Sequence, residues 1–274
     1  MTLISSFILL ATGLFVGFFG GLLGVGGGII MTPVQYAIFT GMGMSPDLAM
    51  KLALGTSLMV ILPTSMSGAW KHHQKKAVVW RAALIMGGVA LFASLGGSTL
   101  AAHIPGTTLK VIFGVVIMLS AIRMVTLRLP EEGEEINVPV WQMVLWALPI
   151  GLLSGLLGVG GGILAVPILT MALGFRMQKA VATSTAMIIL TSIGGVVGYI
   201  LNGHGVSGLP PYSLGYISLP AALLLSVSSV GMAQFGASAA HRLPAKQLRL
   251  IFVVLIIYMG LRMIGVFEWL HWPL

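Results

Sequence analysis

The nine-residue stretch GLLGVGGGI occurs twice in this chain, at residues 21–29 and again at residues 155–163. A proline follows each copy at the same offset, as Pro33 and as Pro167. Three consecutive glycines with a fourth two residues earlier are unfavourable inside a helix, because each glycine costs roughly 0.5–1 kcal/mol relative to alanine. We therefore predict that a helix is interrupted at each copy.

The duplication extends beyond these two copies, because further short matches follow in the same order in both halves. They are Gly55-Thr56-Ser57 with Ala182-Thr183-Ser184, residues 101–103 with 239–241, residues 109–113 with 248–252, and Arg123-Met124 with Arg262-Met263. Duplicated halves are a common plan among membrane transporters. We divide the chain into membrane repeat 1 (residues 1–129), an acidic linker (130–139) and membrane repeat 2 (140–274).

Composition indicates that both repeats lie in a membrane. Apolar residues make up 57% of the chain and charged residues 7%, with a mean hydropathy of +1.05. Soluble domains carry about 25% charged residues. Long apolar segments recur along nearly the whole chain, which is typical of a bundle of membrane helices. We predict an all-α integral membrane protein with four helical units per repeat. The units are residues 3–40, 46–70, 77–101 and 108–128, then 140–173, 177–201, 212–238 and 246–267.

Basic residues predict the orientation of the repeats. Lys and Arg outnumber Asp and Glu 14 to 6, for a net charge of +8, but they lie mainly at the ends of apolar segments. This favours cytoplasmic loops over a nucleic-acid surface. The segment 71–76 is the most basic, whereas its counterpart, 202–212, has no Lys or Arg. In repeat 2 the basic residues instead fall at 176–179 and 242–249. The basic residues thus fall in non-matching connections of the two halves. This predicts that the two repeats have opposite orientations in the membrane.

An inverted pair requires an odd number of crossings in each half. Four full crossings would leave both halves in the same orientation. The simplest solution is that the first unit of each repeat enters the membrane, breaks at the glycine cluster and returns as a hairpin. Each repeat then has one hairpin and three crossings, and both termini are external. The alternative is eight plain crossings with an irregular charge bias.

The interrupted helices predict an anion site. Broken backbone at membrane depth is tolerated only where protein or a water-filled cavity covers it, so each break implies a lined cavity. A helix that restarts there directs free N–H groups and the positive end of its dipole into the cavity, which favours an anion. The backbone candidates for substrate binding are Gly24, Gly26, Gly27, Gly28, Gly158, Gly160, Gly161 and Gly162. The alternative is close helix packing, because Gly17/Gly21, Gly20/Gly24 and Gly24/Gly28 have G-x-x-x-G spacing.

Hydroxyl side chains could complete such a site. Thr56, Ser57, Thr183 and Ser184 occupy matching positions early in the second unit of each repeat and could donate hydrogen bonds to an oxyanion. The alternative is that each hydroxyl bonds to the carbonyl four residues earlier in its own helix. Gln35 is an asymmetric candidate, since Leu169 occupies the matching position in repeat 2.

The sequence gives little support for a catalytic site or a metal site. The chain has no cysteine, and no Asp or Glu falls within a predicted span, so carboxylate relays are not expected. An intramembrane protease needs an acid pair or a Ser–His pair at membrane depth, but His103, His204 and His241 lie near predicted helix ends. We interpret His72 and His73 as part of a solvated basic loop. We expect no enzyme activity, metal site or cofactor.

The doubled GLLGVGGGI motif with its trailing prolines, together with the Gly-Thr-Ser and Ala-Thr-Ser elements, resembles the sulfite exporter TauE/SafE family. This family is also described as the 4-toluenesulfonate uptake permeases. The resemblance covers nearly the full length and both repeats. It implies a multi-pass protein of the inner cell membrane that carries sulfite, sulfonates or related sulfur-containing anions. Members differ in substrate and in direction of transport.

The sequence thus predicts a secondary transporter whose partners are a small anion and the lipid bilayer. Access would alternate around a midplane site between the two glycine-rich breaks. The residues themselves indicate only an anion, and the resemblance supplies the sulfur chemistry. An anion channel and a non-transporting membrane assembly protein are the alternatives. Assembly as a homodimer stays open, as do the coupling ion and the direction.

Overall fold

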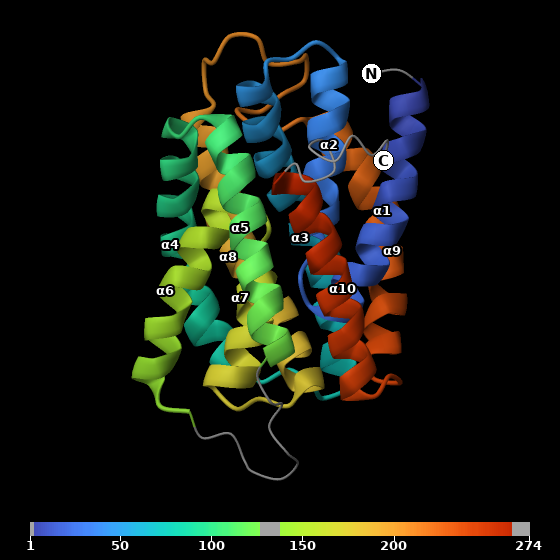
Figure 1. The fold of residues 1–274 in the computed structure, drawn as a ribbon, viewed down its shortest axis with the longest axis vertical. Coiled ribbons are helices and arrows are strands. Elements are labelled where there is room, and N and C mark those ends of the chain that lie inside the picture. Colours follow the sequence, from blue (N-terminus) through green and yellow to red (C-terminus); the bar gives the residue numbers. More distant parts are fainter. Residues whose placement is uncertain (1–2, 127–137, 265–274) are drawn as a thin grey trace.

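Residues 3–126 and 138–264 are described by a computed structural model in which the chain folds as a bundle of helices (Figure 1). Within these two ranges no β-strand is formed, so the all-α prediction is confirmed. Repeat 1 contains α1 (Leu3–Leu23), α2 (Gly28–Gly41), α3 (Pro46–Gln74), α4 (Trp80–His103) and α5 (Gly106–Thr126). Repeat 2 contains α6 (Val140–Leu157), α7 (Gly162–Pro167), the short π-helix η1 (Ile168–Ala172), α8 (Met177–Asn202), α9 (Leu219–Ala240) and α10 (Ala245–Ile264). Most of the predicted acidic linker lies outside the described residues.

Six of these helices are long and apolar enough to cross a membrane, namely α1, α3, α4, α6, α8 and α9. This agrees with the predicted multi-pass membrane protein. The two central helices are α3 and α8, because 78% of the most apolar window of each is buried, against 28–44% for the other four. The remaining helices surround them: α1 packs against α9, α6 against α4, and α5 against α10.

Small residues allow the outer helices to approach closely. A Cβ atom added to Gly21 on α1 would lie 2.1 Å from the carbonyl oxygen of Ala233 on α9, and one added to Gly155 on α6 would lie 2.0 Å from that of Ser94 on α4. Gly17 meets the backbone of Ser229 in the same way. The close-packing interpretation therefore holds for Gly17 and Gly21.

The chain direction is visible in Figure 1. The chain starts at the upper end with α1, and α2 returns to that end, whereas α5 ends and α6 begins at the lower end. The carboxylate of Asp47, at the start of α3, accepts a hydrogen bond from the amide of Gly106, at the start of α5. At the other end of α3, His72 contacts His241 at the end of α9. Helices α1, α3 and α9 therefore run in one direction, and α4, α6 and α8 run in the opposite direction.

Two matching threonines connect each central helix to the start of a helix in the other repeat. The hydroxyl of Thr56 on α3 accepts a hydrogen bond from the amide of Ser218, directly before α9, at 2.9 Å. The hydroxyl of Thr183 on α8 accepts one from the amide of Val79, directly before α4, at 3.1 Å. Both threonines are fully buried. Each therefore satisfies a backbone donor at a helix start.

Replacing Thr56 or Thr183 with valine should lower the free energy of unfolding by about 1–3 kcal/mol, because a buried N–H would lose its acceptor. Thermal unfolding of the purified protein in detergent measures this effect. Thr185→Val is the matched control, since Thr185 is buried on the same helix as Thr183 but donates only to the carbonyl of Val181 in its own helix. Equal destabilisation by all three substitutions would contradict the anchoring role.

Candidate functional site

Both glycine-rich stretches separate two helices with the same backbone conformation. Between α1 and α2, Gly24, Gly26 and Gly27 have φ angles of +70°, +73° and +81°. Between α6 and α7, Gly158, Gly160 and Gly161 have φ angles of +64°, +77° and +87°. Side-chain-bearing residues rarely adopt these left-handed angles, whereas glycine does so readily. Glycine is therefore the residue type that fits the backbone conformation at these six positions.

The two loops, residues 24–27 and 158–161, meet each other. A Cβ atom added to Gly162 would lie 2.4 Å from both the carbonyl oxygen of Gly24 and the Cα atom of Val25. A Cβ atom added to Gly28 would lie 2.8 Å from the Cα atom of Val159. Residues 24–28 and 158–162 are all buried. The structure thus brings together the eight glycines that the sequence marks as a site.

Amide donors gather where the loops meet. The carbonyl of Gly27 accepts hydrogen bonds from the amides of residues 30 and 31, and that of Gly161 from the amides of residues 164 and 165, as helices α2 and α7 begin. Across residues 3–126 and 138–264, no acceptor is found for the amide N–H groups of Gly26, Gly27, Gly160 and Gly161. A buried N–H without a partner costs free energy, so these four donors favour an acceptor brought by a ligand or by water.

Two isoleucines close the space in front of the loops. A Cβ atom added to Gly26 would lie 2.7 Å from Cγ2 of Ile61 on α3, and one added to Gly160 would lie 2.9 Å from Cγ2 of Ile188 on α8. The sequence predicts a lined cavity here. The small cavity of about 10 Å³ near Gly161 lies against α5 and α6 and is lined by neither isoleucine. Because Ile61 and Ile188 lie directly against Gly26 and Gly160, the loops are in a closed arrangement.

A polar cluster lies beside the first loop. The hydroxyl oxygens of Ser57 and Thr32 are 3.0 Å apart, and Nε2 of Gln35 donates to Ser57 Oγ at 3.2 Å. All three side chains are fully buried, and Oε1 of Gln35 has no hydrogen-bond partner in the described part of the chain. Thr32 and Gln35 lie on one face of α2, one and two turns after Gly28. The second Nε2 hydrogen of Gln35 and the hydroxyls of Ser57 and Thr32 can donate to an anion without adding a charge.

Repeat 2 lacks this cluster. Val166 and Leu169 stand at the positions that match Thr32 and Gln35. Ser184, which matches Ser57, donates instead to the carbonyl oxygen of Gly24 at 2.7 Å and so holds the first loop in place. Thr56 and Thr183 are turned toward backbone amides, as described above, and not toward the loops. Of the four hydroxyls singled out in the sequence, Ser57 and Ser184 therefore reach the glycine loops or the cluster beside them.

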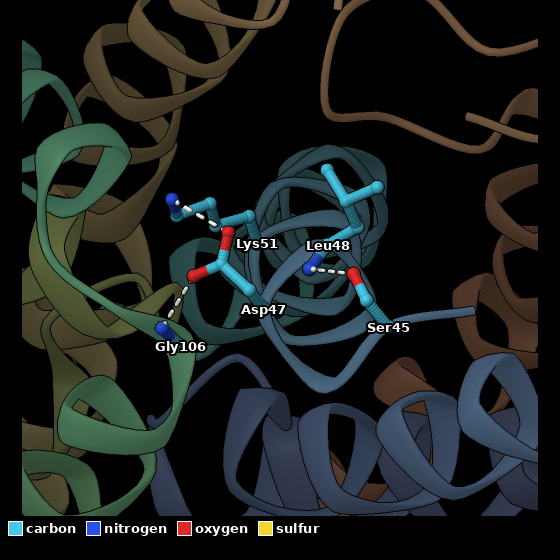
Figure 2. Close-up of polar contacts among 5 residues, drawn as sticks. All are labelled: Ser45, Asp47, Leu48, Lys51 and Gly106. Atoms are coloured by element: carbon cyan, nitrogen blue, oxygen red, sulfur yellow. Dashed lines mark hydrogen bonds and ion pairs between the residues drawn. The ribbon is translucent and has the colours of Figure 1, made fainter. Parts of the chain in front are cut away.

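An ion pair marks the end of the bundle at which α3 begins (Figure 2). Nζ of Lys51 lies 3.0 Å from Oδ2 of Asp47, and Oδ1 of Asp47 accepts from the amide of Gly106. The Lys51 side chain is 9% exposed and lies on α3, one turn before the segment 55–57. Asp47 itself lies in the first turn of α3. Lys51 thus brings a largely buried positive charge to the helix that carries Ser57.

Sequence reasoning missed three of these residues. Thr32 could have been found from its spacing of three residues from Gln35, which places both on one helix face. Lys51 falls within the predicted unit 46–70 but was not considered as a candidate. His72 was interpreted as part of a solvated loop, and this is wrong: α3 continues to Gln74 and His72 is fully buried. The basic residues around it hid its position on the same face as the buried Ser65 and Gly68.

Other surfaces of the bundle offer little chemistry. A cavity of about 600 Å³ lies between α5, α6 and the segment α7–η1, but apolar side chains line it throughout. The described residues hold no group of three or more His, Asp or Glu side chains that could bind a metal ion.

Comparison with known proteins places the chain among membrane transporters. The family model described as sulfite exporter TauE/SafE matches residues 9–263. A probable membrane transporter protein of Methanocaldococcus jannaschii is 33% identical over 259 residues, which cover 94% of each chain. A probable membrane transporter protein of Haemophilus influenzae is 31% identical, with 94% of this chain and 98% of the relative covered. The probable membrane transporter protein YunE of Bacillus subtilis is 30% identical over 72% of this chain and 79% of its own. No solved structure matches.

Proposed function

Because this chain belongs to the sulfite exporter TauE/SafE family of membrane transporters, we propose that it is a secondary transporter of small sulfur-containing oxyanions such as sulfite or organosulfonates. The proposal rests mainly on one observation, the four buried amide donors of the two touching glycine loops. A site made of backbone donors suits an oxyanion, since it offers several directed N–H groups without the cost of a buried cation.

In this proposal the two repeats are inverted and each begins with a re-entrant hairpin, α1–α2 in repeat 1 and α6–α7–η1 in repeat 2. Matching contacts support the symmetry: Thr56 caps the start of α9 in repeat 2, as Thr183 caps the start of α4 in repeat 1. The basic residues of the connections after α3, η1 and α9 fall at one end of the bundle. They are Lys75, Lys76, Arg81, Arg176 and Arg242. This end is then cytoplasmic, the described termini are external, and the membrane is the inner cell membrane.

The anion binds between the loops, held by the amides of Gly26, Gly27, Gly160 and Gly161. The hydroxyl of Ser57 and the amide of Gln35 complete the site from repeat 1. The contribution of the two repeats is unequal, because Leu169 replaces Gln35 and Ser184, which matches Ser57, donates to the carbonyl oxygen of Gly24.

Transport proceeds by alternating access. The closed loops separate the two sides of the membrane, and Ile61 and Ile188 seal the site. One repeat moves relative to the other, so that the loops part toward one side at a time. The small residues between α1 and α9 and between α6 and α4 let each hairpin slide along its partner helix without a large change in packing.

A flux assay tests the proposal. The purified protein is reconstituted into liposomes, and uptake of labelled sulfite and labelled taurine is compared with uptake by empty vesicles. We expect saturable uptake and acceleration of labelled uptake by unlabelled anion trapped inside. Unsaturable flux without such exchange would favour an anion channel. The absence of flux for every sulfur oxyanion offered would favour a non-transporting assembly protein and refute the carrier.

A further inference from the structure

A buried histidine at the basic end of the bundle is connected to the first glycine loop. His72 lies in the last turn of α3 and is fully buried. Its Nε2 atom is 3.1 Å from the carbonyl oxygen of Gly21, one turn before Gly24. Its Nδ1 atom is 2.9 Å from Nε2 of His241, which follows the last residue of α9. A buried ionisable side chain inside a membrane bundle is costly and is usually functional.

The geometry fixes the positions of the protons in this pair. A carbonyl oxygen can only accept, so Nε2 of His72 carries a hydrogen and donates to Gly21. In a neutral imidazole the other nitrogen is then an acceptor. Nε2 of His241 therefore carries the hydrogen that lies between the two rings. The remaining nitrogen, Nδ1 of His241, has no hydrogen-bond partner among the described residues, and the ring is partly exposed.

This arrangement can take up one proton and move it inward. A proton binds to the free Nδ1 of His241, where an N–H bond forms. The hydrogen on Nε2 of His241 then passes to Nδ1 of His72, so that one N–H bond breaks and another forms. His241 is left neutral, and His72 becomes an imidazolium that donates both to Gly21 and to His241. The positive charge thereby moves from a partly exposed ring to a buried one beside the loop.

The surroundings oppose this charge unless an anion is near. Burial and the positive charge of Lys75 lower the pKa of His241 below its usual value. The described residues of α1 and α9 carry no titratable side chain of their own. Among the residues that the structure describes, the other charged or titratable groups at this end of the bundle are basic. They are Lys71, His73, Lys76, Arg81, Arg176, Lys179, Arg242 and Lys246. An anion held at residues 24–27 is therefore the partner that best stabilises a proton on His72.

We infer that His72 and His241 form a proton-binding site that couples the proton to the anion, so that the two are carried together. This inference rests on the proposed transport function and adds its coupling ion. By linkage, anion binding then favours protonation of the pair, and protonation favours anion binding to the same degree.

A transport assay with an imposed pH gradient tests the coupling. The probe is labelled methanesulfonate, whose charge does not change between about pH 5 and about pH 8 while histidine does. For the wild-type protein in liposomes, we expect accumulation to rise about tenfold per unit of pH difference, the ratio set by one proton per anion. In His72→Gln, which keeps a donor for Gly21, and in His241→Gln, we expect exchange of labelled for unlabelled anion to persist while the gradient no longer drives accumulation.

His73→Gln is the matched control, because His73 is exposed on the same helix and accepts a hydrogen bond from Trp80. It should respond to the gradient like the wild type. An undiminished response in both His72→Gln and His241→Gln would overturn the inference and leave the proposed transport intact.

A nuclear magnetic resonance titration of the histidine rings separates the two claims, because it does not depend on flux. We expect the ring signals of His72 and His241 to shift together with pH in the wild type, and the His241 signal to shift alone in His72→Gln. Independent titration in the wild type would overturn the proton site. Joint titration without anion flux in any assay would overturn the transport function, and the coupling with it.

Discussion

Replacing Gly162 with alanine is expected to slow anion transport strongly while the protein still reaches the membrane. The new Cβ atom would lie 2.4 Å from the carbonyl oxygen of Gly24 and from the Cα atom of Val25. Both are backbone atoms that cannot rotate away, so the two loops must separate. Gly162 is not among the glycines with a positive φ angle, so alanine fits the local backbone and the effect arises from the contact between loops. Overpacking costs about 1–3 kcal/mol. Where this cost falls on the closed arrangement through which transport must pass, the transport rate falls by roughly 5- to 150-fold.

Two further variants sharpen this test. Gly28→Ala introduces the reciprocal contact with Val159 and should have a similar effect, because its Cβ atom would lie 2.8 Å from that backbone. Gly96→Ala is the control: Gly96 lies within α4, and a Cβ atom there would have no neighbour within 4 Å. Initial uptake rates per molecule of reconstituted protein provide the measurement. If Gly162→Ala transports as fast as Gly96→Ala, the contact between the loops is not part of the mechanism.

Replacing Gln35 with leucine should raise the KM for the anion by about 10- to 100-fold, because a hydrogen bond to a charged group contributes about 1.5–3 kcal/mol. Leucine is the residue at the matching position of repeat 2, Leu169, where it is fully buried. The substitution should change thermal stability little, because Ser57 loses the Gln35 donor but keeps Thr32 as a hydrogen-bond partner. Oε1 of Gln35 is buried without a partner, so its removal relieves an unfavourable group. A large loss of affinity without a loss of stability would distinguish binding from folding.

The same substitution on another helix provides the control. Gln234 lies on the exposed face of α9, and Gln234→Leu should leave the KM unchanged. Ser57→Ala should act in the same direction as Gln35→Leu, since the two side chains share a hydrogen bond. Unchanged KM values for both Gln35→Leu and Ser57→Ala would show that the anion does not bind beside α2.

The fold was largely accessible from the sequence because its main determinants are local. Low charge and long apolar segments predicted a helical membrane protein, and the structure agrees. The resemblance of GLLGVGGGI to a known family is confirmed by the match over residues 9–263. The inverted orientation of the repeats and the position of the substrate stay predictions.

The side chains of the site were harder to assign because they depend on how α3 and α8 are rotated. Thr56 and Ser57 are neighbours in sequence and chemically alike, but on a helix they point about 100° apart. Ser57 faces Thr32 and Gln35, whereas Thr56 faces the amide of Ser218. Only the packing of distant segments separates these roles. The same holds for His72, whose partners lie 51 and 169 residues away.

The isoleucine pair in front of the loops, Ile61 and Ile188, bears on how well the protein prevents ions from leaking across the membrane. Cγ2 of Ile61 would lie within 3.0 Å of a Cβ atom on either Gly26 or Gly160, and Cγ2 of Ile188 would lie 2.9 Å and 3.5 Å from the Cβ atoms of Gly160 and Gly26. Each side chain therefore contacts both loops at once. In the proposed carrier, a continuous path for ions between the loops would require both isoleucines to move. The two side chains that give way to the anion would then also protect the energy stored in an ion gradient from leakage.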